Sequence, residues 1–231
     1  MNKKLSKRLS ACLDALSSLS SIADIGTDHA YLPCFGISHG IVDSAIAIDV
    51  IDGPLAQARA TIADYGLADK IELRKGSGLQ PLAVGEVDGV NIAGMGGKLI
   101  SQLLLDSLPV AKSMKRLVLQ PQTGEATLRR TLFENDFAII NERLLEEEGL
   151  IYTIITAKPR VNDVTFCDLD VEFGPILRQS VENPLFRRKW QHELDKIDEA
   201  LGRIPAGNQR QTDFEQRKNL IMEVLGNGEN L

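Results

Sequence analysis

The stretch Ala-Asp-Ile-Gly-Thr-Asp-His-Ala-Tyr-Leu-Pro, Ala23 to Pro33, decides the expected fold. Ile22 and Ile25 are β-forming residues on either side of Asp24, and Gly26 ends their apolar run before a polar segment. The pattern then changes to one that predicts a helix. A strand, a glycine turn and a helix in this order place a loop at the carboxyl end of a strand. Open α/β sheets bind their ligands at that position.

The size and composition of the chain predict a soluble globular protein with one large domain, or one domain and an appendage. The chain has 231 residues, of which 43% are hydrophobic and 25% are charged. No apolar run approaches the ~20 residues of a membrane span, and Asp14 interrupts the N-terminal region, which therefore does not resemble a signal peptide. Cys12, Cys34 and Cys167 are too widely spaced for a disulfide framework or a metal site, so we expect no metal and a reducing cytoplasm.

The net charge of −6 is only a weak argument against nucleic acid as a partner, because phosphates are contacted by local basic patches. Two clusters of basic residues could form such patches, and the alternative is that each is a solvated face. They consist of Lys3, Lys4, Lys7 and Arg8 near the N-terminus, and of Arg187, Arg188 and Lys189 toward the C-terminus.

Five strand-like stretches alternate with helix-like ones, which predicts a parallel sheet with helices on both faces. The expected strands are residues 21–26, 44–49, 71–76, 88–94 and 116–121. An amphipathic helix over residues 5–19 precedes the first strand. Pro109 is expected to end a helix over residues 98–108, and Thr123 is expected to cap the next helix.

The pattern changes after the fifth strand. Residues 137–145 and 150–157 are both strand-like, and only Glu146 to Gly149 join them. So short a link permits an antiparallel hairpin and excludes a helical crossover. The expected fold is therefore α/β, with a Rossmann-like sheet that is mostly parallel and ends in an antiparallel hairpin. At fold level this resembles the class I methyltransferases.

Pro159 marks an expected domain boundary, with a sheet domain over residues 1–159 and a helical domain over residues 160–231. Residues 161–173 are mixed and loop-like. Asn183-Pro184 is typical of a helix start, and a second helix is expected after a turn at residues 202–211. Apolar residues at heptad spacing predict that the two helices form an antiparallel hairpin, through self-packing rather than a long intermolecular coiled coil. The first helix contributes Trp190, Leu194, Ile197, Leu201 and Ile204, and the second contributes Phe214, Ile221, Val224 and Leu225.

Three strand ends carry residues suited to a nucleotide-containing ligand. Asp49 ends the second strand, and its carboxylate could accept two hydrogen bonds from a ribose diol; the alternative is a capping or surface aspartate. Gly76-Ser77-Gly78 follows the third strand, where backbone could lie against a flat base or simply turn. Asn91 and the glycines of Gly94 to Gly97 follow the fourth strand, where a glycine cradle could bind phosphate or admit a base.

Several of these stretches together resemble one family, the bacterial tRNA (adenine-N1)-methyltransferases that modify adenine 22. They are class I enzymes that use S-adenosylmethionine and carry a C-terminal helical hairpin. The matching stretches are Leu5-Ser-Lys-Arg-Leu9, Ala23 to Pro33, Gly53-Pro54-Leu55, Ile92-Ala-Gly-Met-Gly-Gly97 and Leu119-Gln-Pro-Gln122. The resemblance covers residues 5 to 160, whereas the tail is similar mainly in length and helical character. At Ser77 many relatives carry an acid, which leaves the contact with the adenine amine open between side chain and backbone.

The resemblance implies methyl transfer from S-adenosylmethionine to N1 of adenine 22 in tRNA. The residues expected to bind the cofactor are Asp24, Gly26, Asp28, His29, Asp49, Gly76, Ser77, Gly78, Asn91 and Gly94. The residues expected to contact tRNA are Lys4, Lys7, Arg8, Arg187, Arg188 and Lys189. His29 taken alone would more often be a structural, hydrogen-bonded histidine.

N1 of adenine has an in-plane lone pair and no proton, so no strong general base is needed before it attacks. Positioning and stabilisation of the charge gained by the ring should do the catalytic work. That charge makes the N6 amino protons more acidic, so we expect Asp28 to accept from them, Asn91 to supply a further acceptor, and Tyr31 to offer a stacking surface.

Other functions are less compatible with the same residues. A dehydrogenase needs the Gly-x-Gly-x-x-Gly loop, and only Gly26 is present. A non-catalytic RNA-binding protein with this fold would not need a cofactor pocket. The presence of Gly26 and Asp49, which suit such a pocket, argues against this alternative. A methyltransferase acting on another base is a further alternative, although the loop after Asn91 lacks the Asn/Asp-Pro-Pro-Tyr sequence of enzymes that methylate amino groups.

Overall fold

The computed structural model describes residues 5–160, 165–203 and 209–226 of the chain. Its internal contacts divide the chain into two compact units, Met1–Gly174 and Pro175–Leu231. The first unit holds a seven-stranded sheet, and the second holds two long helices. Within the described ranges, no helix is both long and apolar enough to cross a bilayer.

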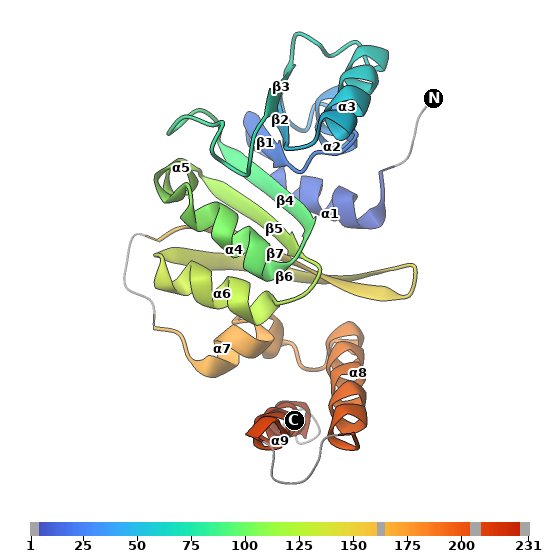
Figure 1. The fold of residues 1–231 in the computed structure, drawn as a ribbon, viewed down its shortest axis with the longest axis vertical. Coiled ribbons are helices and arrows are strands. Elements are labelled where there is room, and N and C mark those ends of the chain that lie inside the picture. Colours follow the sequence, from blue (N-terminus) through green and yellow to red (C-terminus); the bar gives the residue numbers. More distant parts are fainter. Residues whose placement is uncertain (1–4, 161–164, 204–208, 227–231) are drawn as a thin grey trace. The chain divides into compact units, whose positions relative to one another are not determined.

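The sheet has the strand order β3-β2-β1-β4-β5-β7-β6, and its first five strands run parallel (Figure 1). The strands are β1 (Ser21–Ile25), β2 (Ser44–Asp49), β3 (Ile71–Lys75), β4 (Gly89–Met95), β5 (Arg116–Pro121), β6 (Phe137–Glu147) and β7 (Leu150–Pro159). β7 pairs antiparallel with both β5 and β6, and Glu148 and Gly149 form the turn with positive φ angles of 52° and 78°. The predicted mostly parallel sheet with a final antiparallel hairpin is confirmed.

The strand order reverses between β1 and β4, which are neighbours in the sheet although β2 and β3 lie between them in the sequence. Connections that leave β1 and β4 therefore diverge to opposite sides of the sheet and open a crevice at their carboxyl ends. The stretch that begins at Ala23 leads out of β1 on one side of this switch point, and the glycines at the end of β4 lead out on the other.

Helices cover both faces of the sheet. α1 (Lys7–Leu16), α2 (Tyr31–Ser38) and α3 (Asp52–Asp64) contribute to a core on one face, together with residues of the sheet. α4 (Gly97–Leu105), α5 (Leu108–Ser113) and α6 (Glu125–Glu134) contribute to a second core on the other face. The helical spacing in α1 is confirmed, since Cys12, Leu13 and Leu16 are buried on the sheet and the Ser6 hydroxyl oxygen accepts a hydrogen bond from Leu9 N at 3.2 Å.

Two helix boundaries differ from the sequence-based expectation. Pro109 does not end α4, which already ends at Leu105; it lies in the first turn of α5, where a missing N–H costs nothing. Thr123 does not cap α6. The cap residue is Gly124, with a φ of 75°, and it makes no side-chain hydrogen bond to the helix.

The segment after Pro159 contains a short helix, α7 (Asp168–Phe173), where a loop was expected. α7 packs on α6, and the fully buried Arg129 of α6 donates through Nη1 to the carbonyl oxygens of Val171 and Glu172, at 3.2 and 2.9 Å. Arg129 also pairs with the buried Glu142 of β6 at 2.8 Å. Residues up to Gly174 therefore belong with the sheet, and the division into compact units falls after Gly174 rather than after Pro159.

The second unit contains a 3₁₀ turn (Leu177–Gln179), α8 (Pro184–Leu201) and α9 (Gln209–Gly226). As expected, Asn183 caps α8, and its side-chain oxygen accepts from Leu185 N at 2.9 Å. Trp190, Leu194 and Ile197 are buried, whereas Ile204 lies outside the described residues. α9 packs on α8 within the same chain. It begins at Gln209, inside the turn that was expected over residues 202–211.

Candidate active site

The loop after β1 has an unusual backbone. Gly26, Asp28 and Ala30 have φ angles of 68°, 53° and 56°, and two of these residues are not glycine. The N–H groups of Gly26 and Thr27 both donate to the Ile48 carbonyl oxygen of β2, at 2.9 and 3.1 Å. Strained backbone persists where the surroundings hold it, and is concentrated at functional sites. A Cβ at Gly26 would overlap the methyl group of Met95, so the loops after β1 and β4 approach each other here.

Asp24 is buried beneath this loop. Its carboxylate accepts hydrogen bonds from Thr27 Oγ1 at 2.7 Å and from Asn91 Nδ2 at 2.8 Å. Burial raises the pKa of the carboxyl from 3.8 to about 6, although the hydrogen bonds from Asn91 and Thr27 act in the opposite direction. Asp24 therefore ties the loop after β1 to β4.

Asn91 is also buried, with 1% of its surface exposed. Because Nδ2 faces the Asp24 carboxylate, the amide is oriented and its oxygen points elsewhere. Among the described residues, Asn91 Oδ1 has no hydrogen-bond partner. A buried acceptor left unpaired is costly, and a donor on a bound ligand would relieve the cost.

Asp49 lies at the end of β2 with 9% of its surface exposed. Its two carboxylate oxygens accept from Asp28 N at 3.3 Å and Ile51 N at 3.1 Å. The alternative readings of a helix cap or a surface aspartate are wrong, because Ile51 is itself the cap residue of α3 and the carboxylate contacts no later amide of that helix. The carboxylate is thus held in place and retains acceptor capacity.

Asp28, His29 and Tyr31 lie together on the loop after β1. The Asp28 side chain is 69% exposed, and Oδ1 lies 3.6 Å from His29 Nε2. The His29 and Tyr31 rings are stacked, with centroids 5.3 Å apart and planes 14° apart. The loop therefore offers one exposed carboxylate beside a pair of flat rings.

The glycines after β3 and β4 have different physical roles. Gly76 and Gly78 let the chain pass close to Pro81 and Leu103, so this turn is tightly packed, with Ser77 half-buried between them. Gly97 faces the Gly124 carbonyl oxygen, which a Cβ would overlap, and Gly97 N donates to the Thr123 carbonyl oxygen at 2.7 Å. Gly97 is thus explained by close packing. Gly94 is exposed with a φ of 79° and is free of this constraint.

The structure brings all ten predicted cofactor residues to one side of the sheet, at or near the carboxyl ends of its strands. The residues at the carboxyl ends of neighbouring strands are Asp24, Gly26, Asp28, His29, Asp49, Gly76, Ser77, Gly78, Asn91 and Gly94. Val50 and Ile51, which the sequence analysis did not single out, are 53% and 59% exposed directly after Asp49 and are candidates to join this set. Two large apolar residues after a strand-ending acid are a signal that could have identified them.

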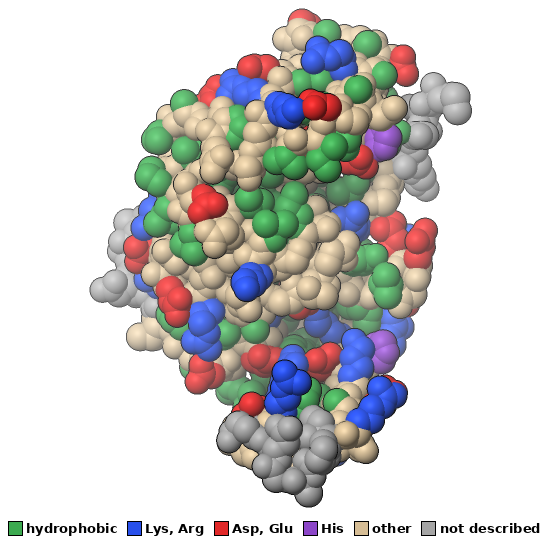
Figure 2. Space-filling view, viewed as in Figure 1, with side chains coloured by type: hydrophobic (Ala, Val, Ile, Leu, Met, Phe, Trp, Pro, Cys, Tyr) green, Lys and Arg blue, Asp and Glu red, His purple; other side chains and the backbone are tan. Residues whose placement is uncertain are grey.

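The predicted basic residues lie in both units, and Lys4 falls outside the described residues. Lys7 is exposed and Arg8 half-buried in the first turn of α1, and the backbone N–H of each donates to Glu147. Arg187, Arg188 and Lys189 lie on α8, where Arg187 is 3.8 Å from Glu182. Figure 2 shows Lys and Arg side chains on the visible face of the second unit, with acidic side chains among them.

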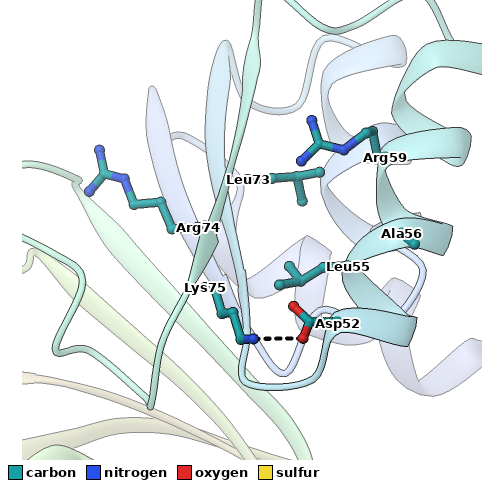
Figure 3. A pocket seen from close by; sticks show the side chains of 7 residues that line it. All are labelled: Asp52, Leu55, Ala56, Arg59, Leu73, Arg74 and Lys75. Atoms are coloured by element: carbon teal, nitrogen blue, oxygen red, sulfur yellow. Dashed lines mark hydrogen bonds and ion pairs between the residues drawn. The ribbon is translucent and has the colours of Figure 1, made fainter.

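A separate pocket lies between α3 and the edge strand β3 (Figure 3). Its lining includes Asp52, which pairs with Lys75 at 2.7 Å at one end of the group drawn, and Arg59 and Leu73 toward the other. None of the predicted cofactor residues lines it. The pocket is therefore distinct from the strand-end loops described above.

Comparison with known proteins gives consistent matches. Residues 22–226 match the family model described as tRNA (adenine(22)-N(1))-methyltransferase. The chain is 32% identical to a Bacillus subtilis protein named tRNA (adenine(22)-N(1))-methyltransferase, over 97% of this chain and 98% of that protein. The crystal structure of the B. subtilis m1A22 tRNA methyltransferase is similar with a TM-score of 0.88 at 31% identity, covering 96% of this chain and 99% of that one. A Streptococcus pneumoniae protein solved in complex with S-adenosyl-L-methionine also has a TM-score of 0.88, at 35% identity over 96% of this chain and all (100%) of that one.

Proposed function

Because the chain belongs to the tRNA (adenine(22)-N(1))-methyltransferase family, we propose that it transfers a methyl group from S-adenosylmethionine to N1 of adenine 22 in tRNA. The observation that carries this proposal for the chain's own residues is the set of Asp24, Asp49 and Asn91 on β1, β2 and β4, beside the point where the strand order reverses. We infer that the protein acts in the cytoplasm, where its tRNA substrate is found.

The chemistry of the site fits the cofactor. S-adenosylmethionine carries a ribose diol, an ammonium group and an adenine, and all three need partners. The Asp49 carboxylate, held by two backbone amides, suits the diol, and Val50 and Ile51 offer apolar surface to the base. The unpaired oxygen of Asn91 suits a donor such as the ammonium group. Gly26 has no Cβ, so its backbone can lie directly against the ligand.

The cofactor supplies an electrophilic methyl group on a sulfonium, and the chain's residues place and stabilise the adenine. N1 needs no base to attack, so the contribution of the protein is orientation, exclusion of water and acceptance of the charge that the ring gains. Asp28 presents an exposed carboxylate on the loop after β1, where it can accept from the N6 amino group. Tyr31, stacked on His29, offers a flat surface to the base.

We propose that the tRNA backbone is contacted by basic residues of both units, Lys7 and Arg8 in the first and Arg187, Arg188 and Lys189 in the second. The proposal for the second unit rests on its basic side chains and on a core of its own around Trp190. A solvated face without a partner is the alternative. Phosphate contacts would make tRNA binding weaken steeply with salt, whereas a solvated face would leave the salt dependence unchanged when its charges are removed.

The decisive experiment is incubation of the protein with labelled S-adenosylmethionine and unmodified tRNA, followed by nuclease digestion and mass spectrometry. N1-methyladenosine at position 22 supports the proposal. N6-methyladenosine would contradict the proposal that N1 is the methylated atom. Binding of tRNA without any methyl transfer would favour a non-catalytic RNA-binding protein.

A further inference from the structure

Two stretches of the sequence that carry no chemistry by themselves meet beside Gly94. They are Leu5-Ser-Lys-Arg-Leu9 at the start of α1 and Leu119-Gln-Pro-Gln122 at the end of β5. Arg8 Nη1 donates to Gln120 Oε1 at 2.6 Å, across 112 residues of sequence. The same oxygen accepts from Gly94 N at 3.0 Å. The contact therefore joins α1, β5 and the end of β4 through one atom.

The Gln120 side chain bonds to the backbone of β4 at a point where the pairing of β4 with β5 is irregular. β4 pairs with β5 up to Ala93 and resumes at Met95, so that Gly94 forms a bulge with a φ of 79°. At this bulge the Gly94 N–H donates to the side chain of the fully buried Gln120. Gln120 Nε2 is fixed in turn by the Pro121 carbonyl oxygen at 2.8 Å. Bulges beside active sites redirect the chain that follows them.

Arg8 is held by contacts of both its backbone and its side chain. Its backbone N–H donates to Glu147 Oε2 at 3.3 Å, and its guanidinium lies 5.6 Å from the centroid of the Tyr152 ring. The guanidinium also lies 3.6 Å from the position that a Cβ of Gly94 would occupy. A side chain anchored in this way is preorganised to hold Gln120, rather than swinging freely in solvent.

We propose that Arg8 is a positioning residue for methyl transfer: through Gln120 it fixes the bulge at Gly94 and thus the loop, Gly94 to Gly97, on the acceptor side of the crevice. Arg8 acts through Gln120 and not on the reacting atoms. This inference rests on the proposed function, since it needs the loop after β4 to face the adenine.

The competing reading is that Arg8 serves only as a phosphate contact. It has physical support, because within the described ranges Nε and Nη2 of Arg8 have no hydrogen-bond partner. The two readings differ in what Gln120 does. A phosphate contact has no need of Gln120, whose side chain is fully buried and out of reach of RNA.

The test uses Arg8→Met, Gln120→Met and the double variant in the full-length protein. Met is unbranched, so at either position it fills much of the original space without the donor or acceptor. We expect each single variant to slow methyl transfer at least about tenfold in single turnover, with tRNA and S-adenosylmethionine both saturating. The cofactor affinity should stay within about threefold. The double variant should be no slower than the slower single variant, because both changes remove one contact.

Arg143→Met is the matched control, since Arg143 is an exposed arginine of β6 that pairs with Asp14 of α1 at 3.7 Å. It should leave both tRNA binding and the rate at saturation unchanged. Arg8→Lys separates the two roles and leaves the buried Gln120 unchanged. If Arg8 only contacts phosphate, lysine keeps the charge and the enzyme should be nearly normal. If Arg8 positions Gln120, methyl transfer should be slowed even at saturating tRNA.

Three results would overturn the positioning role. They are a normal single-turnover rate for Arg8→Met at saturating tRNA, a multiplicative loss in the double variant, and a normal rate for folded Gln120→Met. If Gln120→Met does not fold, the rates of Arg8→Met and Arg8→Lys decide the question alone. Failure of the wild-type protein to form N1-methyladenosine would instead refute the proposed function, so the two failures are distinguishable.

Discussion

At the scale of single residues, three aspartates, on β1, on β2 and on the loop after β1, have different environments and hence different expected roles. Asp24 is buried and satisfied by Thr27 and Asn91, Asp49 is buried but held by backbone amides, and Asp28 is exposed. A buried carboxylate that retains acceptor capacity suits a bound hydroxyl group, whereas an exposed one suits a substrate that arrives from solvent. Three single substitutions separate these roles.

We expect Asp49→Ala to weaken S-adenosylmethionine binding by about 1–3 kcal/mol, because the ribose diol loses a charged acceptor. Calorimetry on the variant measures the loss directly. Asp52→Ala is the control, since Asp52 is an exposed acid three residues on that pairs only with Lys75 among the described residues. Equal affinity of Asp49→Ala and the wild-type protein would contradict the assignment.

For Asp28 we expect a loss of methyl-transfer rate rather than a loss of cofactor affinity. Asp28→Asn should slow single-turnover methyl transfer and leave cofactor affinity within a few-fold, because the amide is a poorer acceptor for the N6 protons. Asn also tolerates the left-handed backbone at this position, where φ is 53°, so the change adds little strain. A parallel loss of rate and cofactor affinity would show that Asp28 orders the loop or contacts the cofactor instead.

For Asp24 the prediction concerns stability and pH. Burial raises the pKa of its carboxyl to about 6, above the 3.8 of an exposed aspartate. Between about pH 4 and pH 6 the folded state therefore binds more protons than the unfolded state, and the free energy of unfolding falls as the pH rises. Asp24→Asn removes this dependence, so the stability of the variant relative to wild type should improve from pH 4 to pH 7.

The expected improvement is at most about 3 kcal/mol, since each unit of pKa shift is worth about 1.4 kcal/mol. Urea denaturation of both proteins at pH 4, 5, 6 and 7 measures it. Thr27→Val tests the cause: removing the Thr27 donor should raise the pKa further and shift the midpoint of the trend to higher pH. A difference between Asp24→Asn and wild type that is constant over this range would refute a raised pKa.

At the scale of secondary structure, strands were predicted more accurately than the ends of helices. Five strands begin and end within about one residue of the expected positions, because apolar runs and glycines mark their limits in the sequence. Pro109 was misread because proline is compatible both with the end of a helix and with the first turn of another. α7 was missed because six residues give too few turns to show a period, and its stability comes from tertiary contacts.

The same distinction applies to the site. Asp49, Asn91 and the loop after β1 were predictable because parallel strands bring their carboxyl ends to one edge of the sheet. The link between Arg8 and Gln120 was not, because a hydrogen bond between side chains 112 residues apart leaves no local pattern. Sequence periodicity reports which face of an element is buried, and it does not report which polar side chains meet.

The buried pair of Arg129 and Glu142 gives a test of how α7 is held. We expect Glu142→Gln to lower the free energy of unfolding by about 3–5 kcal/mol, because it leaves the Arg129 charge buried without its partner. Arg130→Ala is the matched control on the same helix: Arg130 pairs with Asp168 of α7 at 3.2 Å, but both side chains are exposed. That variant should change stability by less than about 1 kcal/mol. Similar losses in urea denaturation for both would contradict the proposed anchor.

At the scale of the whole molecule, the sheet and the helical hairpin have separate cores. The sheet is covered by two apolar clusters, and the hairpin has its own seam around Trp190 and Ile197. The compact units divide after Gly174, with α7 on the side of the sheet. Cofactor binding and tRNA binding should therefore be separable by truncation, provided that the cut spares α7.

We expect a chain ending at Gly174 to fold and to bind S-adenosylmethionine like the full-length protein, because every proposed cofactor residue lies in the first unit. A chain ending at Lys158 is the matched comparison. It should be less stable, since Arg129 loses its acceptors at Val171 and Glu172. Thermal denaturation and calorimetry of the two chains test both statements.

The chain ending at Gly174 should methylate tRNA much more slowly than the full-length protein at subsaturating tRNA, because the phosphate contacts proposed for Arg187, Arg188 and Lys189 are absent. Each phosphate contact that is lost should also make the dependence of tRNA affinity on salt less steep, by roughly one unit in the slope of log K against log salt. Full-length protein carrying Arg188→Gln and Lys189→Gln should show the smaller change expected for two contacts. Full methylation efficiency by residues 1–174, with an unchanged salt slope, would confine tRNA recognition to the sheet unit and its N-terminal helix.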